Sequence, residues 1–310
     1  MGGDGYALAL RAGAELVDME FVQFFPIGHL APRLIGMDPI MWDPFRYKLG
    51  GRLLNANREQ FEETYAAQDA RSDGTYILTR DNATYAITKE VEAGRGSPAG
   101  GVWLSFEHIP EAELRRAFGP VIDRLAKNGI DLGKQCVEVA PMAHYHMGGV
   151  RVDTRFETRI KNLFACGEAI GGANGANRLS GNAITEALVF GARAGAEAAR
   201  VAERGAQAWS DAAAASTIDM LRAGRKAGEA NLAREVVDLQ ALMSRDVGPF
   251  RTQEKLERAL ARLEVMAREI GETPMRGVDK SWLIPPDAMT LTRLEDLSFN
   301  NACANIFPNS

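Results

Sequence analysis

The chain has 310 residues, of which 46% are hydrophobic and 25% are charged, and its formal net charge is -5. This composition is that of a folded globular protein and excludes a disordered or fibrous chain, while the length predicts two or three domains. A pI near 5.6 argues against a nucleic-acid partner, which usually requires a basic surface. No run approaches the roughly 20 apolar residues of a membrane span, and the N-terminus lacks the features of a secretory signal. We therefore expect a soluble cytoplasmic protein.

The three cysteines are Cys136, Cys166 and Cys303. Their number is odd and their spacing is not that of paired ligands, so they predict thiols in a reducing compartment rather than a disulfide framework or a zinc site. We expect no metal site.

The first half of the chain predicts mixed helices and strands. A helix over 4–14 precedes a strand over 14–22, and the residues 26–46, rich in Pro and Gly, predict an ordered irregular loop. Asp81 is expected to cap a helix that runs to about residue 93 and stops at Gly94. Further along, a strand over 102–106 and two short helices, 110–119 and 120–128, are predicted.

The segment from 147 to 205 is rich in glycine. Strands are predicted over 150–152 and 160–166, followed by a glycine loop and a long helix over 182–203. Backbone N–H groups at such a helix start attract an anion, so this order predicts a turn that holds a phosphate or a cofactor. Beyond residue 207 the sequence becomes helical.

Apolar residues at three- and four-residue steps predict a helix over 252–270, and three leucines indicate a last helix over 291–297.

Two histidines, His144 and His146, lie two positions apart. In an extended segment they point to opposite faces, so they are not expected to bind one metal. A turn with one surface histidine is the alternative interpretation. Arg178 lies between the glycine loop and the helix start, where its guanidinium can bind a carboxylate through two parallel hydrogen bonds; the alternative is an arginine that ties down the loop through carbonyl groups. Arg80, just before a predicted helix, is a third candidate, and a surface arginine beside a helix cap is its alternative.

Together, seven motifs occur in the order of a known family. They are Gly3-Asp4-Gly5, Leu16 to Phe24, Arg80-Asp81, Glu92 to Gly96, His144-Tyr145-His146-Met147-Gly148-Gly149, Ala165-Cys166-Gly167-Glu168 and Gly175 to Asn182. The chain resembles the flavoprotein subunit of succinate dehydrogenase and fumarate reductase, whose relatives include L-aspartate oxidase. The resemblance implies an α/β fold with an α+β capping domain and a C-terminal helical segment. Its expected domains are a partial, Rossmann-like FAD-binding domain (1–28 and 141–207), a capping domain (29–140) and an incomplete C-terminal helical domain (208–310).

The resemblance also implies a cofactor, FAD, and an activity, hydride transfer between the flavin and a C–C bond next to a carboxylate. Arg80 matches a proton donor or acceptor, and His144 and Arg178 match residues that hold substrate carboxylates. The expected cofactor-binding residues are Gly148, Gly149, Gly167, Glu168, Asn182, Ala183 and Ile184. A guanidinium is a poor acid in water, so the arginine would need desolvation and a neighbouring acid such as Asp81.

Two positions depart from the family pattern. Phe25 follows Gln23-Phe24 where relatives that act on succinate carry a histidine, and Trp42-Asp43-Pro44 stands where a Thr-Glu pair is usual. Because a phenyl ring cannot hydrogen-bond a carboxylate and Asp43 would repel one, we expect an acid whose far end is neutral, apolar or cationic. His29 or a loop arginine could instead rebuild a dicarboxylate site.

No Gly-x-Gly-x-x-Gly turn is found, so the chain is expected to lack the half of the FAD domain that makes most phosphate contacts and to bind FAD poorly alone. The resemblance implies a small carboxylic-acid substrate, a partner in the form of an iron–sulfur electron-transfer subunit, and a cytoplasmic location at the membrane periphery through that partner. The alternative function is a non-catalytic fragment or partner-binding remnant that no longer binds FAD.

Overall fold

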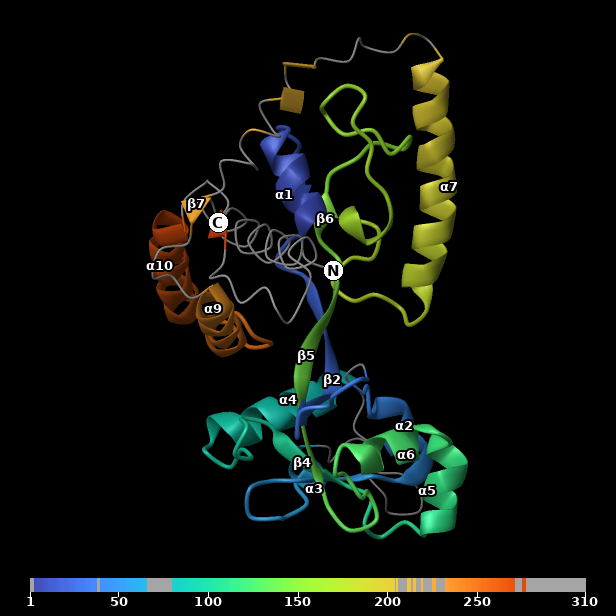
Figure 1. The fold of residues 1–310 in the computed structure, drawn as a ribbon, viewed down its shortest axis with the longest axis vertical. Helices are drawn as coiled ribbons and strands as arrows, with labels where there is room; N and C mark the ends of the chain where they lie inside the picture. Colours follow the sequence, from blue (N-terminus) through green and yellow to red (C-terminus); the bar gives the residue numbers. More distant parts are fainter. Residues whose placement is uncertain are drawn as a thin grey trace. The chain divides into compact units, whose positions relative to one another are not determined.

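The computed structural model describes residues 3–37, 40–65, 80–203, 205, 211–212, 214–215, 219, 225–226, 232–270 and 275–276. The chain divides into two compact units (Figure 1). Unit 1 comprises Met1–Val22 and His146–Ser310, and unit 2 comprises Gln23–Tyr145. Unit 2 is therefore inserted in the sequence of unit 1, and each unit has its own hydrophobic core.

The N-terminal part of unit 1 is a short helix followed by a small antiparallel sheet. Helix α1 (Asp4–Arg11) leads into strand β1 (Leu16–Val17), which pairs with β6 (Gly149–Val150) so that Leu16 lies opposite Val150. Leu16 and Val150 also belong to the small core beneath α1. Because β1 is the first strand of unit 1 and β6 follows the insertion, this pairing joins the two sequence segments of the unit.

The glycine-rich part of unit 1 ends in a long helix. A single 3-10 turn, η1 (Gly167–Ala169), precedes α7 (Asn182–Ala202), and both contact each other. In Figure 1 the irregular chain between β6 and α7 lies between α1 and α7. Phe156 in that chain packs against Phe190 of α7, with ring centroids 5.1 Å apart. The aromatic pair holds α7 against the loop that precedes it.

The C-terminal helices of unit 1 form a hairpin. α9 (Leu232–Asp246) packs on α10 (Gln253–Ile270) through an apolar cluster that includes Leu239 and Leu263. Asp246 is fully buried at the end of α9. The remaining short strands, β7 (Arg225–Lys226) and β8 (Met275–Arg276), pair in parallel.

Unit 2 is built on a four-stranded sheet with strand order β2-β5-β4-β3. Its strands are β2 (Val22–Ala31), β3 (Arg52–Leu54), β4 (Val102–Ser105) and β5 (Val137–His146). The pairs β3–β4 and β4–β5 are antiparallel: Leu53 lies opposite Leu104, and Val102 opposite Val139. The chain enters unit 2 through β2 and leaves it through β5, so these two strands carry the residues at both ends of the insertion.

Five helices are present in the described part of unit 2. They are α2 (Asp43–Leu49), α3 (Glu62–Tyr65), α4 (Arg80–Glu92), α5 (Glu111–Phe118) and α6 (Val121–Lys127). In Figure 1 α2, α5 and α6 lie together at one end of the unit, and the rings of Phe45 and Phe118 stack there with centroids 4.2 Å apart.

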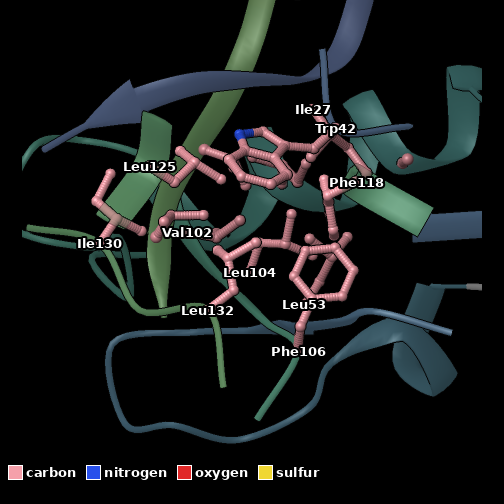
Figure 2. Packing of buried hydrophobic residues seen from close by; sticks show 14 of the residues in the cluster. Ile27, Trp42, Leu53, Val102, Leu104, Phe106, Phe118, Leu125, Ile130 and Leu132 are labelled. Atoms are coloured by element: carbon pink, nitrogen blue, oxygen red, sulfur yellow. The ribbon is translucent and has the colours of Figure 1, made fainter. Parts of the chain in front are cut away.

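Trp42 is the largest side chain of the unit 2 core and is fully buried. Figure 2 shows its indole beside Phe118 and above Leu104, in a cluster to which Leu53 and Phe106 also belong. Burying a side chain of this size contributes about 2–3 kcal/mol of stability. Because Trp42 directly precedes α2, its burial fixes the start of that helix.

Most predicted helices are present, and the differences concern strands. β2 extends through the segment predicted as an irregular loop, and α2 occupies its end, so that interpretation of 26–46 was wrong in part. The expected strand over 160–166 is not formed; among the described residues, its one ladder contact is a bridge between Glu157 and Phe164. The strand β5 and the helix α9 were not predicted individually. The expected helix at 291–297 lies outside the described residues.

Candidate functional site

Arg80 and His144 both contact one aromatic ring. The guanidinium carbon of Arg80 is 5.6 Å from the centroid of the Phe25 ring, and the imidazole of His144 meets the same ring edge-on with centroids 5.6 Å apart. Phe25 comes from β2, His144 from β5 and Arg80 from the start of α4. The tertiary fold of unit 2 thus brings together two of the three predicted catalytic residues, which are 64 positions apart in sequence.

Asp43 is the acidic partner of Arg80. Its Oδ2 lies 3.5 Å from Arg80 Nε, and its side chain is 1% exposed whereas that of Arg80 is 40% exposed. Burial raises the pKa of Asp43 above its ordinary value, and the nearby charges of Arg46 and Arg80 partly oppose that rise. The second carboxylate oxygen, Oδ1, is buried and has no hydrogen-bond partner among the described residues. The pair therefore consists of a buried carboxyl group and a half-exposed guanidinium group.

This geometry corrects one expectation. Asp43 was expected to face a ligand as a bare anion, but it is nearly inaccessible and its charge is directed toward Arg80. Arg46, one turn further along α2, donates to Glu62, and both side chains are buried. Asp43 and Glu62 are thus each ion-paired with an arginine of unit 2.

His29 does not supply a ligand-binding group in this structure. Its Nε2 contacts the carbonyl oxygen of Pro32 at 2.6 Å, and its Nδ1 accepts a hydrogen bond from Trp42 Nε1 at 3.2 Å. Both ring nitrogens are therefore engaged in closing the loop after β2. The hypothesis that His29 rebuilds a dicarboxylate site is not supported by these contacts.

Helix α4, which carries Arg80, is anchored at its other end by Glu90. This buried carboxylate accepts hydrogen bonds from Tyr65 Oη at 2.7 Å, from Arg95 Nη2 at 2.7 Å and from Asn55 Nδ2 at 3.2 Å. Hydrogen bonds from Arg95, Tyr65 and Asn55 lower the pKa of Glu90 and keep it ionised. The network fixes the position of α4 and with it the placement of Arg80.

In unit 1 the predicted cofactor-binding glycines lie where two backbones approach closely. A Cβ at Gly148 would overlap the carbonyl group of Asp18, and one at Gly149 would come within 2.6 Å of Ala169 O. Only glycine permits this approach of β6 to the turn after β1 and to η1. Gly148 and Gly149 therefore shape the unit by allowing these chains to touch.

Glu168 is the centre of a polar cluster in unit 1. Its Oε1 accepts a hydrogen bond from the backbone N–H of His146 at 3.2 Å, and its carbonyl oxygen accepts one from Tyr6 Oη at 3.0 Å. Burial, followed by the charge of Glu168, raises the pKa of Tyr6 to about 12. Burial lowers the pKa of His146, with Glu168 opposing the change. His146 and Glu168 are thus held by α1 and η1.

His144 and His146 have different surroundings, as their spacing predicted. His144 contacts Phe25 in unit 2, whereas His146 lies against Tyr6 in unit 1 with ring centroids 6.0 Å apart. The division between the units falls between Tyr145 and His146. Across the part of the chain that the structure describes, no group of three or more His, Cys, Asp or Glu side chains is arranged to hold a metal.

The loop before α7 is exposed, with Arg178 as its buried exception. Arg178 is 7% exposed and donates from Nη1 to the carbonyl oxygen of Leu179 at 3.1 Å. This contact is of the kind expected if the arginine ties down its own loop. Asn182 and Ile184, at the start of α7, are exposed, and no side chain caps the helix at Gly181.

Sequence reasoning named Arg80, His144 and Arg178 as candidates but did not predict several polar contacts of the two units. Asp43 was assigned the wrong role, and neither Glu62 as the partner of Arg46 nor Tyr6 as the partner of Glu168 was predicted. An acid at the first position of a helix, followed by proline, was the available signal for Asp43. None of the described helices is long and apolar enough to cross a membrane.

Comparison with known proteins places these features in context. The sequence profile of the family described as "FAD binding domain" matches residues 1–184. The chain is 36% identical over 271 residues to a fumarate reductase (CoM/CoB) subunit of Methanothermobacter marburgensis, a match that covers 87% of this chain and 48% of that protein. It is 33% identical over 286 residues to L-aspartate oxidase of Streptomyces coelicolor, covering 89% and 47%.

Solved structures give the same result. A mutant FrdA chain of Escherichia coli quinol fumarate reductase superposes with a TM-score of 0.78 at 30% identity, covering 98% of this chain and 53% of that one. The α/β fold is therefore that of fumarate reductase and succinate dehydrogenase flavoproteins, as predicted. The chain spans about half the length of the curated relatives that it matches.

Proposed function

The chain belongs to the family of FAD-binding domains that includes the fumarate reductase and succinate dehydrogenase flavoproteins, and from this premise we propose that it carries the substrate-binding and catalytic portion of an FAD-dependent oxidoreductase. The proposed reaction converts a C=C bond next to a carboxylate into a C–C bond, or the reverse. The observation that supports it best is the pairing of Arg80 with the buried Asp43, beside His144, within unit 2.

The residues of unit 1 suit the cofactor. The glycine-bearing loop before α7 is exposed, Gly175 and Gly181 have open space at their Cβ positions, and the first turn of α7 contains no acidic residue. The uncapped N–H groups of a 21-residue helix favour negative charge, such as develops on a reduced flavin ring. We therefore assign Gly167, Glu168 and the α7 residues Asn182, Ala183 and Ile184 to holding FAD.

FAD, when bound, supplies or accepts the hydride at one carbon of the substrate bond. The other carbon must then receive or lose a proton, and in this proposal Arg80 is the group that transfers it. A guanidinium transfers a proton poorly by itself, but Asp43, 3.5 Å away, can return the proton to it. Because burial raises the pKa of Asp43, this carboxyl exchanges a proton more readily near neutral pH than an exposed aspartate does.

His144 and Arg178 are proposed to hold the substrate carboxylate. Charge-assisted hydrogen bonds from such groups orient the acid and withdraw electrons from the adjacent C=C bond, which favours hydride addition. An iron–sulfur electron-transfer subunit, with attachment at the membrane periphery, is the proposed source or acceptor of the electrons.

The first test of this proposal is cofactor binding followed by turnover. The 310-residue chain would be dialysed against FAD, its flavin absorbance recorded, and fumarate and crotonate reduction followed with a chemically reduced dye as the electron donor. A chain that binds FAD and reduces either acid supports the proposal. Because the chain by itself is expected to bind FAD poorly, the assay is run at a saturating FAD concentration. Absence of acid reduction by the FAD-saturated chain would favour the second candidate function, a non-catalytic remnant that retains the fold and binds a partner.

A matched pair of arginines tests the role of Arg80. Arg80 and Arg95 are comparably exposed, at 40% and 42%, and both are ion-paired with a buried acid, Asp43 and Glu90 respectively. Arg80→Lys is expected to lower kcat by at least about 100-fold, the usual size of a general acid–base contribution, while Arg95→Lys retains most of it. Equal losses in both variants would show that Arg80 acts only in holding α4.

A further inference from the structure

Arg80 and His144 share an apolar neighbour, the ring of Phe25. The guanidinium carbon of Arg80 lies over this ring, 5.6 Å from its centroid, and the imidazole of His144 makes a T-shaped contact with it, with centroids 5.6 Å apart. Phe25 is 4% exposed, so this ring is a fixed part of unit 2 rather than a mobile surface group. A ligand that reaches Arg80 and His144 therefore meets no hydrogen-bond donor on the ring that both contact.

The basic side chains nearest to this part of unit 2 already have partners. Arg80 faces Asp43, and Arg46 faces Glu62. His29, which lies in β2, has both ring nitrogens engaged by Pro32 and Trp42. Arg80, Arg46 and His29 are therefore each held by a group of the protein itself.

Transferring an ionised group out of water is strongly unfavourable unless a charged or hydrogen-bonding partner compensates for the lost hydration. A second carboxylate placed beside Phe25 would lose its hydration and gain no charge-assisted hydrogen bond from the ring. For a methyl group at the same position, leaving water is favourable, and the group also makes contact with the aromatic ring. The chemistry of this surface thus favours one carboxylate and one apolar end.

From these contacts we propose that Phe25 determines substrate specificity and that the substrate is a small monocarboxylic acid with an apolar group at the end away from its carboxylate. The proposal rests on the function proposed above, in which Arg80 and His144 act on the substrate. Phe25 sets the choice of acid by occupying the place where a donor would be needed for a dicarboxylate.

Crotonate and fumarate are a matched pair of probes, because crotonate carries a methyl group where fumarate carries its second carboxylate. Calorimetric titration of the FAD-treated full chain with each acid gives the two dissociation constants without requiring turnover. We expect crotonate to bind at least about tenfold more tightly than fumarate. Fumarate binding equally or more tightly would overturn the inference and leave the proposed function standing.

Two substitutions locate the effect at Phe25. Phe25→His places a hydrogen-bonding ring next to Arg80 and His144 and is expected to reduce the crotonate preference at least about tenfold. Phe25→Leu keeps the surface apolar and is expected to retain the preference. An unchanged ratio in a folded Phe25→His chain, checked by circular dichroism, would overturn the assignment to this residue.

The wild-type comparison needs no variant, so it stands even if either substitution prevents folding. Binding of neither acid to the flavin-loaded chain would refute the proposed carboxylate site itself, and the inference with it. Failure of the specificity inference can therefore be told apart from failure of the proposed function.

Discussion

Replacing Asp43 with asparagine is expected to stabilise unit 2 at neutral pH while impairing the proposed proton transfer. Asp43 is 1% exposed, and burial raises its pKa despite the opposing charges of Arg46 and Arg80. The ionised carboxylate is therefore less favourable in the folded chain than in water. Asparagine has nearly the same shape and no charge, so it removes the cost of burying the anion.

The size of the gain follows from the unfavourable burial of the ionised carboxyl. Each unit by which burial raises the pKa of a carboxyl corresponds to a cost of about 1.4 kcal/mol for its ionised form. Arg80 loses its partner in the variant, but its side chain is 40% exposed and remains solvated. We therefore expect a gain of about 1 kcal/mol for Asp43→Asn.

The sign of the pH dependence is fixed by the direction of the pKa shift. An unfolded aspartate loses its proton near pH 4, whereas folded Asp43 keeps it to a higher pH. Between these two values the folded state binds more protons, so the wild-type free energy of unfolding falls as pH rises. Asp43→Asn lacks this fall, and its advantage should disappear below about pH 4.

The measurement is amide hydrogen exchange of α2, which gives the local free energy of opening from about pH 4 to about pH 8. Asp246 is the matched control, because it is also fully buried but accepts hydrogen bonds from Arg245 and Arg258 that lower its pKa. Asp246→Asn should destabilise α9 by about 1–2 kcal/mol at neutral pH, the opposite sign. Destabilisation of α2 by Asp43→Asn at neutral pH would refute this reasoning.

Three further changes test the remaining features. Gly148→Ala should destabilise the chain by more than about 3 kcal/mol in urea denaturation, because the new Cβ overlaps the Asp18 carbonyl; a loss below about 1 kcal/mol would contradict the close approach. Tyr6→Phe should remove a tyrosine that ionises near pH 12 in absorbance titration at high pH, since burial and Glu168 raise its pKa to about 12; an unchanged titration would show that Tyr6 is accessible. Arg178→Lys should lower kcat/KM by at least about 30-fold, because lysine lacks the planar pair of donors that a guanidinium presents to a carboxylate. A rate near wild type at matched FAD content would show that Arg178 only holds its loop through the carbonyl oxygen of Leu179.

Local sequence features were sufficient for most helices. α5, α7 and α10 were predicted closely because each has start and stop residues adjacent in sequence and apolar residues at helical spacing. Strands were predicted less well. The segment 160–166 has the composition of a strand, but a strand also needs a partner, and the fold gives it only the bridge between Glu157 and Phe164.

The family and its cofactor could be predicted from the order of short motifs, and comparison with known proteins confirmed both. The division into domains and the roles of Arg80, His144 and Arg178 stay predictions. These roles were assigned one residue at a time, since the sequence contains no distances between residues far apart in the chain.

The sequence by itself determined which residue types are present, the helices that local spacing specifies and the family. Only the tertiary structure decided their partners: it buried Asp43 beside Arg80, and placed Phe25 in contact with both Arg80 and His144. The physical reason is that the charge and pKa of a carboxylate depend on its solvation and on cations a few ångströms away. The fold brings those groups together from β2, α2, α4 and β5, and no local pattern records that approach.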